Sequence, residues 1–228
     1  MKLKSSRAKI EELPNDLIGE VVGQLVSHSP TPISDLDNLR ITCKTFHAAS
    51  KEKSVGRRIA IEKERWMQWW DSDRYNGILE HCAKVGNPEA CFLLGLKIVF
   101  DLGDVSVGLG YLRKAVEGGH VAALYTVGIV LFGYEKEEEL GMEYLKKFEA
   151  LCNCHAEVED AGVPQVERYR RKALDAIRLV TWRRWSGMKR ERCTIPWCGG
   201  RIGWDNCKYF CSESCKWSCE CFEFYEEM

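Results

Sequence analysis

Apolar residues in the first fifty positions recur at helical spacing and are interrupted by polar, proline-containing breaks. Between residues 13 and 50, aliphatic pairs stand at positions 17/18, 21/22 and 25/26, which places them along one stripe of a helix with 3.6 residues per turn. Pro14 suits the first turn of such a helix, where its missing N–H would have no partner. Residues 27–32 carry two Pro and three Ser/Thr and end the helix. Ser34, with Asp37 three positions later, fits the capping box of a second helix.

Helices this short bury too little apolar surface to be stable alone, so either the rest of the chain or another protein must cover them. The stretch resembles the F-box: Leu13-Pro14, Asp16, Leu17/Ile18, Asp35-Leu36, Leu39-Arg40, Cys43-Lys44 and Phe46 fall at its characteristic positions. The resemblance implies docking on a Skp-type adaptor of a cullin ubiquitin ligase. The alternative is a helix pair covered by its own chain. The adaptor-binding residues that the resemblance implies are Leu13, Pro14, Leu17, Ile18, Val21, Val22, Leu25, Leu36, Leu39, Arg40, Cys43, Lys44 and Phe46.

A second pattern, with a period of 33 residues, runs from residue 76 to residue 150. The matched pairs are Gly86/Gly119, Ala90/Ala123, Gly95/Gly128, Gly108/Gly141, Tyr111/Tyr144 and Leu112/Leu145. We expect helices over 76–85 and 88–100, a turn at 101–104 and another helix from Val107. Such periods are typical of stacked helical hairpins, and the small residues should lie where helices approach closely. The segment resembles the Sel-type branch of tetratricopeptide-like repeats. His120 is expected to start a helix.

Two further segments flank these repeats. Residues 56–75 form an aromatic linker with Trp66, Trp69 and Trp70, which we expect to anchor the N-terminal module to the next segment of the chain; a peptide-binding groove is the alternative. Residues 163–186 predict a basic amphipathic helix. Its charges are expected to pair with acidic residues of the chain, the Glu135–Glu139 run and the terminal Glu220, Glu223, Glu226 and Glu227. Nucleic-acid binding, with Tyr169, Trp182 and Trp185 stacking on bases, is the alternative.

Composition narrows the class of protein. The formal net charge of −1 over 228 residues does not favour nucleic acid or an acidic membrane surface. No apolar run reaches the eighteen or so residues of a membrane span, and the basic N-terminus has no apolar run behind it, so we expect a soluble, intracellular protein of the cytoplasm or nucleus. No nucleophile–base pair, phosphate loop or carboxylate pair stands out, which predicts no catalysis by this chain. The charge and the lack of a long apolar run predict no membrane partner and do not favour nucleic acid.

Twelve cysteines are unusual for an intracellular chain, where disulfides are rare. Seven lie in the last thirty-six positions, which indicates metal binding. We expect Cys193, Cys198, Cys211 and Cys215 to hold one structural zinc ion in a closed tetrahedron, with Cys207, Cys219 and Cys221 as alternative ligands. The span from Phe210 to Cys215 resembles the FCS and MYND classes of zinc finger. Cys43, Cys82 and Cys91 are expected to be small buried hydrophobes, and residues 152–155 a loop without metal.

The segments in order resemble a plant-type F-box family. Their expected bounds are 10–55 for the F-box, 56–75 for the linker, 76–150 for the repeats, 163–186 for the basic helix and 193–222 for the finger. The expected fold is mainly α: a short three-helix F-box, stacked antiparallel helical hairpins of α-solenoid type and a small zinc finger. The resemblance implies a non-catalytic substrate-recognition subunit of a Skp–cullin–F-box ubiquitin ligase, with repeats and finger binding the target protein. A scaffold or nucleic-acid-associated zinc protein is the alternative.

Overall fold

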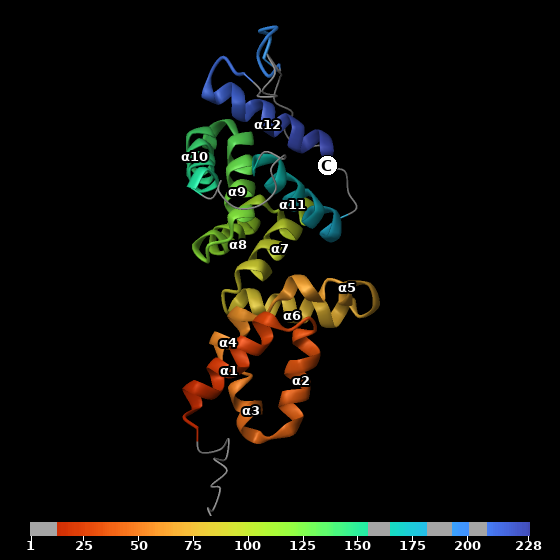
Figure 1. Cartoon of the computed structure of the whole chain (residues 1–228). Helices are drawn as coiled ribbons and strands as arrows, with labels where there is room; N and C mark the ends of the chain where they lie inside the picture. Colours follow the sequence, from red (N-terminus) through yellow and green to blue (C-terminus); the bar gives the residue numbers. More distant parts are fainter. Residues whose placement is uncertain (1–12, 155–164, 182–192, 201–208) are drawn as a thin grey trace, which may run out of the picture. The chain divides into compact units, whose positions relative to one another are not determined.

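The computed structural model describes residues 13–154, 165–181, 193–200 and 209–228 (Figure 1). All the secondary-structure elements in these ranges are helices, which confirms the mainly α prediction. The chain divides between Cys91 and Phe92 into two compact units. Among the described helices, none is both long and apolar enough to cross a membrane.

The first unit is a cluster of short helices, drawn in red to gold in Figure 1. In chain order these are α1 (Asn15–His28), α2 (Pro32–Thr42), α3 (Lys44–Ala49), α4 (Lys53–Arg58), a 3₁₀ turn (Ile61–Glu64), α5 (Met67–Trp70) and α6 (Ser72–Lys84), followed by the start of α7 (Pro88–Lys97). Helix α1 packs on α2, α3 and α4, and Val22, Leu36 and Ile61 are almost completely buried in the core between them. Lys63 donates to the carbonyl oxygens of His28 (3.0 Å) and Ser29 (2.9 Å), which places a cation at the C-terminal end of α1 where the helix dipole favours it.

The predicted break between the first two helices is confirmed, but the predicted start of the second is wrong. Helix α2 begins at Pro32, with Thr31 at its N-cap position, so Ser34 lies inside the helix and does not cap it. Proline at the first helical position starts the helix without losing a hydrogen bond. Asp37 instead forms ion pairs with Arg40 and Arg74.

Asn87 holds the end of α4 against the start of α7. Its side-chain amide is buried and donates to the carbonyl oxygens of Gly56 (3.1 Å) and Ile59 (2.9 Å), while its Oδ1 accepts from the backbone N–H of Ala90 at 3.0 Å. One side chain therefore caps α7 and links it by hydrogen bonds to the backbone at the end of α4.

The second unit contains the repeats and the C-terminal helices. Its elements are the rest of α7, a π-helical turn (Ile98–Leu102), α8 (Val105–Glu117), α9 (Val121–Gly133), a 3₁₀ turn (Glu135–Glu137), α10 (Glu138–Cys154), α11 (Gln165–Val180) and α12 (Glu213–Glu227). Helix α9 contacts α8, α10, α11 and α12, and from Ala122 to Gly133 every residue is buried. It is the central helix of the unit.

The 33-residue period predicted from sequence is present in the helix packing. A Cβ atom on Gly95 would lie 2.8 Å from Leu112 Cγ, and one on Gly128 would lie 2.7 Å from Leu145 Cγ. Gly95 and Gly128 are one matched pair and Leu112 and Leu145 another, so the same close contact occurs twice. The prediction that the small residues mark close helix approaches is confirmed.

The turns of the repeat are equally regular. Gly86 and Gly119 both have positive φ angles, 86° and 84°, which glycine adopts without strain after a helix. His120 caps α9 through Nδ1, which accepts from the backbone N–H of Ala123 at 3.0 Å, and its ring stacks on Phe92 with a centroid separation of 4.3 Å. Its predicted role as a helix-start residue is confirmed.

Helices α11 and α12 are joined by a buried arginine. Arg170 lies on α11 and contacts three carboxylates of α12: Glu220 (3.0 Å from Nε), Glu223 (2.7 Å) and Glu227 (2.8 Å). The Nε–Glu220 contact is an ion pair and not a hydrogen bond; the hydrogen bond to Glu220 comes from Nη2 at 3.2 Å. Burial lowers the pKa of Arg170, but Glu220 and Glu223 outweigh it and the pKa is raised above its usual value.

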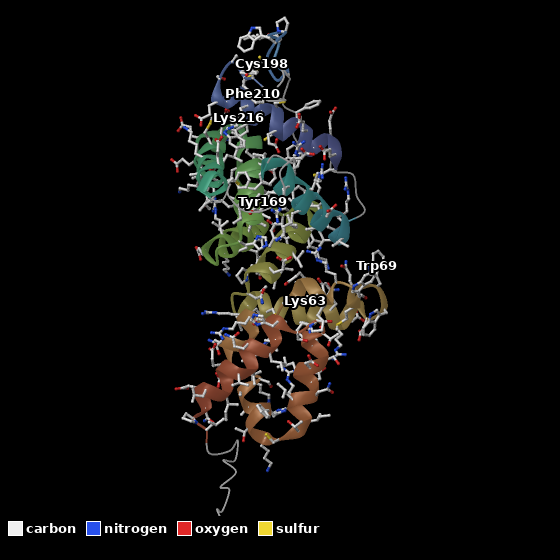
Figure 2. The ribbon with its side chains drawn as sticks, in the orientation of Figure 1. Lys63, Trp69, Tyr169, Cys198, Phe210 and Lys216 are labelled. Carbon is white, nitrogen blue, oxygen red and sulfur yellow. The ribbon has the colours of Figure 1, made fainter. Side chains whose placement is uncertain are left out.

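This network confirms the predicted pairing of the basic helix with the terminal glutamates. The helix itself ends at Val180, and residues 182–186, with the two predicted stacking tryptophans, lie outside the described residues. Tyr169 packs edge-on against Phe148 with their centroids 5.3 Å apart, so the described aromatic residue of this helix contributes to packing (Figure 2).

Two other sequence predictions are wrong. Trp66, Trp69 and Trp70 are 77%, 63% and 68% exposed, and Figure 2 shows Trp69 pointing outward from α5; of this cluster Met67 is buried, so the indoles do not anchor the module. Residues 152–154 form the last turn of α10 and not a loop. His155 lies outside the described residues.

Candidate docking face and metal centre

Helix α1 carries two apolar stripes that lie in different environments. Ile18, Val22 and Val26 are at most 1% exposed and form part of the core. The second stripe, one position earlier in each turn, is open to solvent: Leu17 is 52%, Val21 56% and Leu25 37% exposed, and Leu13, just before the helix, is 43% exposed. We call these four residues the α1 face.

The close packing behind α1 explains why only one stripe is covered. A Cβ atom on Gly19 would lie 2.5 Å from Glu52 Oε2, and one on Gly23 would lie 3.0 Å from Arg58 Nη1, so these glycines let the end of the α3–α4 segment approach the helix. Arg58 continues over the edge of α1 to pair with Glu20 at 2.7 Å. The α1 face points away from this contact because it lies on the other side of the helix.

The remaining residues implied by the F-box resemblance differ in how far they are buried. Ile18, Val22 and Leu36 are buried, whereas Leu39, Arg40, Cys43 and Phe46 are half-buried and Pro14 and Lys44 are exposed. Cys43 has a local role, because its Sγ accepts from the backbone N–H of Phe46 and caps α3. Sequence reasoning missed Ile41, which is 83% exposed on α2; its apolar character beside polar neighbours was the available signal.

The four cysteines expected to bind metal come together at one point. Their Sγ atoms all lie within 4.8 Å of one another, with separations of 3.8 Å for Cys193–Cys211, 3.7 Å for Cys198–Cys211 and 3.4 Å for Cys198–Cys215. A tetrahedral zinc–thiolate site with Zn–S bonds of about 2.3 Å has sulfur–sulfur edges of about 3.8 Å. The donor set therefore fits a zinc ion in both chemistry and size.

Local structure positions each of these sulfurs. Cys198 closes a turn by donating its backbone N–H to Ile195 O (3.1 Å), and Gly199 follows with a φ of 77°. Gly199 then donates to Tyr209 O at 2.7 Å, and Tyr209 donates to Gly200 O at 3.2 Å, which pairs the two short segments that carry Cys198 and Cys211. Cys215 occupies the first turn of α12, where Ser212 caps the helix by accepting from the Cys215 N–H at 3.1 Å. Figure 2 shows Cys198 and Phe210 beside this end of α12.

Electrostatics of the cluster favour a cation. A hydrogen bond from the Ile195 backbone lowers the pKa of the Cys193 thiol, whereas hydrogen bonding with the thiols of Cys193 and Cys211 raises the pKa of Cys215. Four sulfurs this close together cannot all ionise next to one another without a compensating positive charge. A divalent metal supplies that charge and takes the thiolate form as its ligand.

Helix α12 joins this cluster to the helical repeats. Its residues Trp217, Cys221 and Phe224 are at most 1% exposed, and Lys216 pairs with Glu149 on α10. Packing on α9 and α10 therefore holds the helical part of this C-terminal segment in place. Cys221 is buried beside Ile129 O and Cys219 lies beside Glu223, so neither belongs to the cluster. Cys207 lies outside the described residues.

The scattered cysteines Cys82 and Cys91 are buried, as predicted, while Cys43 is half-buried. Burial raises the pKa of Cys82 to about 12 and that of Cys152 to about 11. These thiols are therefore protonated and behave as small hydrophobic side chains.

Comparisons with known proteins agree with the helical repeats and with an F-box relationship. Residues 61–162 match a family model described as plant tetratrico peptide repeats. A putative F-box protein of Arabidopsis thaliana is 28% identical over 177 residues, which is 78% of this chain and 55% of the relative. A second F-box protein of that plant is 28% identical over 128 residues, covering 54% of this chain and 32% of the relative. A third is 25% identical over 146 residues, covering 62% of this chain and 84% of the relative.

The chain thus spans about half of the first of these relatives and about a third of the second. No solved structure matches the chain. The similarity supports a plant F-box and repeat protein, and the relatives' names say nothing of zinc or of a target protein.

Proposed function

We propose that the chain is a non-catalytic substrate-recognition subunit of a Skp–cullin–F-box ubiquitin ligase. In this role the α1 face docks on a Skp-type adaptor and, through it, a cullin. The repeats and the C-terminal cysteine cluster hold the target protein. The assembly would work in the cytoplasm, the nucleus or both.

The observation that carries the proposal is the α1 face. Its four exposed aliphatic side chains, three on one line of α1 and one just before the helix, are an apolar patch of the kind that marks protein–protein contacts. Covering them would contribute on the order of 1–2 kcal/mol each, because each already buries part of its surface. The similarity to three F-box proteins supports an adaptor as the occupant.

A zinc ion held by Cys193, Cys198, Cys211 and Cys215 is part of the proposal. The ion would be structural, since four thiolates leave no open position for substrate or water. It would fix the loop carrying Trp197, which is 49% exposed, against the start of α12. In keeping with the sequence resemblance, we assign the finger to the FCS/MYND-like class.

Adaptor capture tests the ligase proposal. The full chain is co-expressed with a plant Skp-type adaptor, and recovery of the adaptor is measured for the wild type, Leu17→Asp and Val21→Asp. Leu102→Asp is the matched control, because Leu102 is 67% exposed on the second unit. We expect capture by the wild type and the control, and loss of capture by both α1 variants with unchanged helical content. A folded wild-type chain that captures no adaptor would refute the proposal.

Metal analysis tests the zinc site. We expect about one zinc ion per purified chain, and loss of that zinc in a Cys198→Ser/Cys211→Ser double variant. Cys43→Ser is the control, because Cys43 belongs to the first unit and is not one of the four clustered cysteines. A chain that is purified in the presence of zinc and binds none would show that the four thiols are not a metal site.

A further inference from the structure

A pocket of about 340 Å³ lies in the first unit between α2, α6 and the residues that follow α4. Its floor is apolar: Ile33, Leu36, Ile59 and Cys82 are each at most 6% exposed. The α1 face does not contribute to the lining residues that the structure describes. Its volume is at the lower end of the range for small-ligand sites, which suits one small group and not the surface of a folded protein.

The rim of the pocket is positively charged. Asp37 on α2 is flanked by Arg40 on the same helix, at 3.1 Å, and by Arg74 on α6. Two guanidinium groups therefore share one carboxylate. Arg40 also donates to the neutral Ser50 Oγ at 3.0 Å, so Asp37, Arg40 and Arg74 together carry a net charge of +1. His81 also lines the pocket.

Arg40 and Arg74 have N–H donors left to bind a ligand. Together they carry ten N–H groups, and within the part of the chain that the structure describes their hydrogen bonds use three. The side chains of Asp37, Arg40 and Arg74 are 41%, 37% and 44% exposed, so a ligand can reach them from solvent. A planar guanidinium is the group best suited to pair with a carboxylate through two parallel hydrogen bonds.

Gly77 keeps the wall of this pocket open. It lies in the middle of α6 and lines the pocket, although glycine inside a helix is less stable than alanine. A Cβ atom there would meet nothing within 4 Å, in contrast to Gly95 and Gly128, and its φ angle is not positive. Neither helix packing nor backbone conformation requires glycine at this position. Close approach of a ligand to the helix backbone would require glycine there.

We propose that this pocket binds a carboxylate carried on a small apolar group. The carboxylate pairs with Arg74 and Arg40 at the rim, and the apolar group covers Leu36 and Ile59 on the floor. Two sources supply this chemistry: the C-terminal residue of a peptide, or a free aliphatic acid. Leu36 and Arg40 belong both to this pocket and to the residues expected to contact the adaptor, whereas Arg74 and Gly77 line the pocket alone. Variants at Arg74 and Gly77 therefore test this inference separately from the ligase proposal.

Calorimetric titration of the full chain tests this inference with three probes: N-acetyl-leucyl-leucine as the free acid, the same dipeptide as its amide, and hexanoate. We expect the free acid to bind and the amide to bind at least about tenfold more weakly, because a charge-assisted hydrogen bond is lost. Tighter binding of the dipeptide than of hexanoate would identify a peptide terminus as the source. Equal or tighter binding of hexanoate would identify a free acid.

Variants locate the binding. Arg74→Gln should weaken binding of the acid about tenfold, and Gly77→Leu should abolish it by filling the pocket. Arg113→Gln, at an exposed arginine on α8, should leave it unchanged. Adaptor capture should be unaffected in all three, which separates this inference from the proposed function. Failure of both acids to bind at millimolar concentration, equal binding of acid and amide, or undiminished binding by a folded Gly77→Leu variant would each overturn it.

Discussion

Replacing Arg170 with methionine should destabilise the second unit more than any exposed charge in the same helix. The Arg170 and Glu220 side chains are 8% and 10% exposed and 3.0 Å apart. With an effective dielectric constant of about 20, their Coulomb attraction is about 5.5 kcal/mol, which largely offsets the cost of taking both charges out of water. Removal of the cation leaves Glu220 buried, with the hydroxyl of Tyr125, 2.7 Å away, as a neutral donor.

The expected loss is about 3–5 kcal/mol in the free energy of unfolding, the usual cost of leaving one member of a buried pair alone. Glu223 and Glu227 add little to this figure, because at 24% and 48% exposed they can be solvated by water. Urea denaturation, monitored by far-UV circular dichroism, measures this loss in the free energy of unfolding. Arg171→Met is the matched control, since Arg171 is 59% exposed and pairs with Glu167; it should cost less than about 0.5 kcal/mol.

A double-mutant cycle tests the physical reason for the loss. Glu220→Gln alone should cost less than Arg170→Met, because Arg170 keeps two other carboxylates. In the Arg170→Met/Glu220→Gln double variant no buried charge remains unpaired, so it should be more stable than Arg170→Met by about 2 kcal/mol. If Arg170→Met costs under about 1 kcal/mol, or if the double variant is no more stable than the single one, the reasoning about a buried ion pair is wrong.

Three further predictions concern packing, capping and ionisation. Gly128→Ala should lower the unfolding free energy by about 1–3 kcal/mol in urea titrations, because its Cβ would meet Leu145 at 2.7 Å; Gly110→Ala, with nothing within 4 Å, should raise it by about 0.5–1 kcal/mol. Asn87→Ala should cost about 2–3 kcal/mol in the same assay, since it removes a helix cap and the buried hydrogen bonds to the carbonyl oxygens of Gly56 and Ile59. Burial raises the pKa of Cys82 to about 12, so the stability it contributes is complete below pH 9 and falls as the pH rises toward 12. Iodoacetamide at pH 8 should therefore modify Cys82 far more slowly in the folded chain than in urea, as measured by mass spectrometry; equal rates would contradict the burial.

Several features of the fold follow from local sequence patterns alone. The 33-residue period predicted which glycines lie at close helix contacts, because a repeated unit must repeat its packing to stack on itself. Asp71 and Ser212 cap α6 and α12 by local hydrogen bonds that depend on residues three positions apart. The spacing of the four C-terminal cysteines likewise predicted their convergence, since each pair lies within a short turn or a single helical turn.

Other features could not be predicted because they depend on residues far apart in the chain. Arg170 is fifty residues from Glu220, and the sequence showed only that acidic partners existed. The Asp37–Arg74 pair and the pocket beside it likewise join α2 to α6. The tryptophans at 66, 69 and 70 were expected to be buried because aromatic rings usually are, but their short helix turns them outward.

Helix α1 shows most clearly which features the sequence determines and which depend on the tertiary structure. Its sequence alone determined that two adjacent lines of aliphatic residues would run along α1, because helical geometry places residues four apart on one stripe. The sequence did not determine which line would be covered, since Leu17 and Ile18 are equally apolar. The tertiary structure decided that, because α2, α3 and α4 pack against the Ile18, Val22 and Val26 line. Leu13, Leu17, Val21 and Leu25 are left exposed and available to a partner.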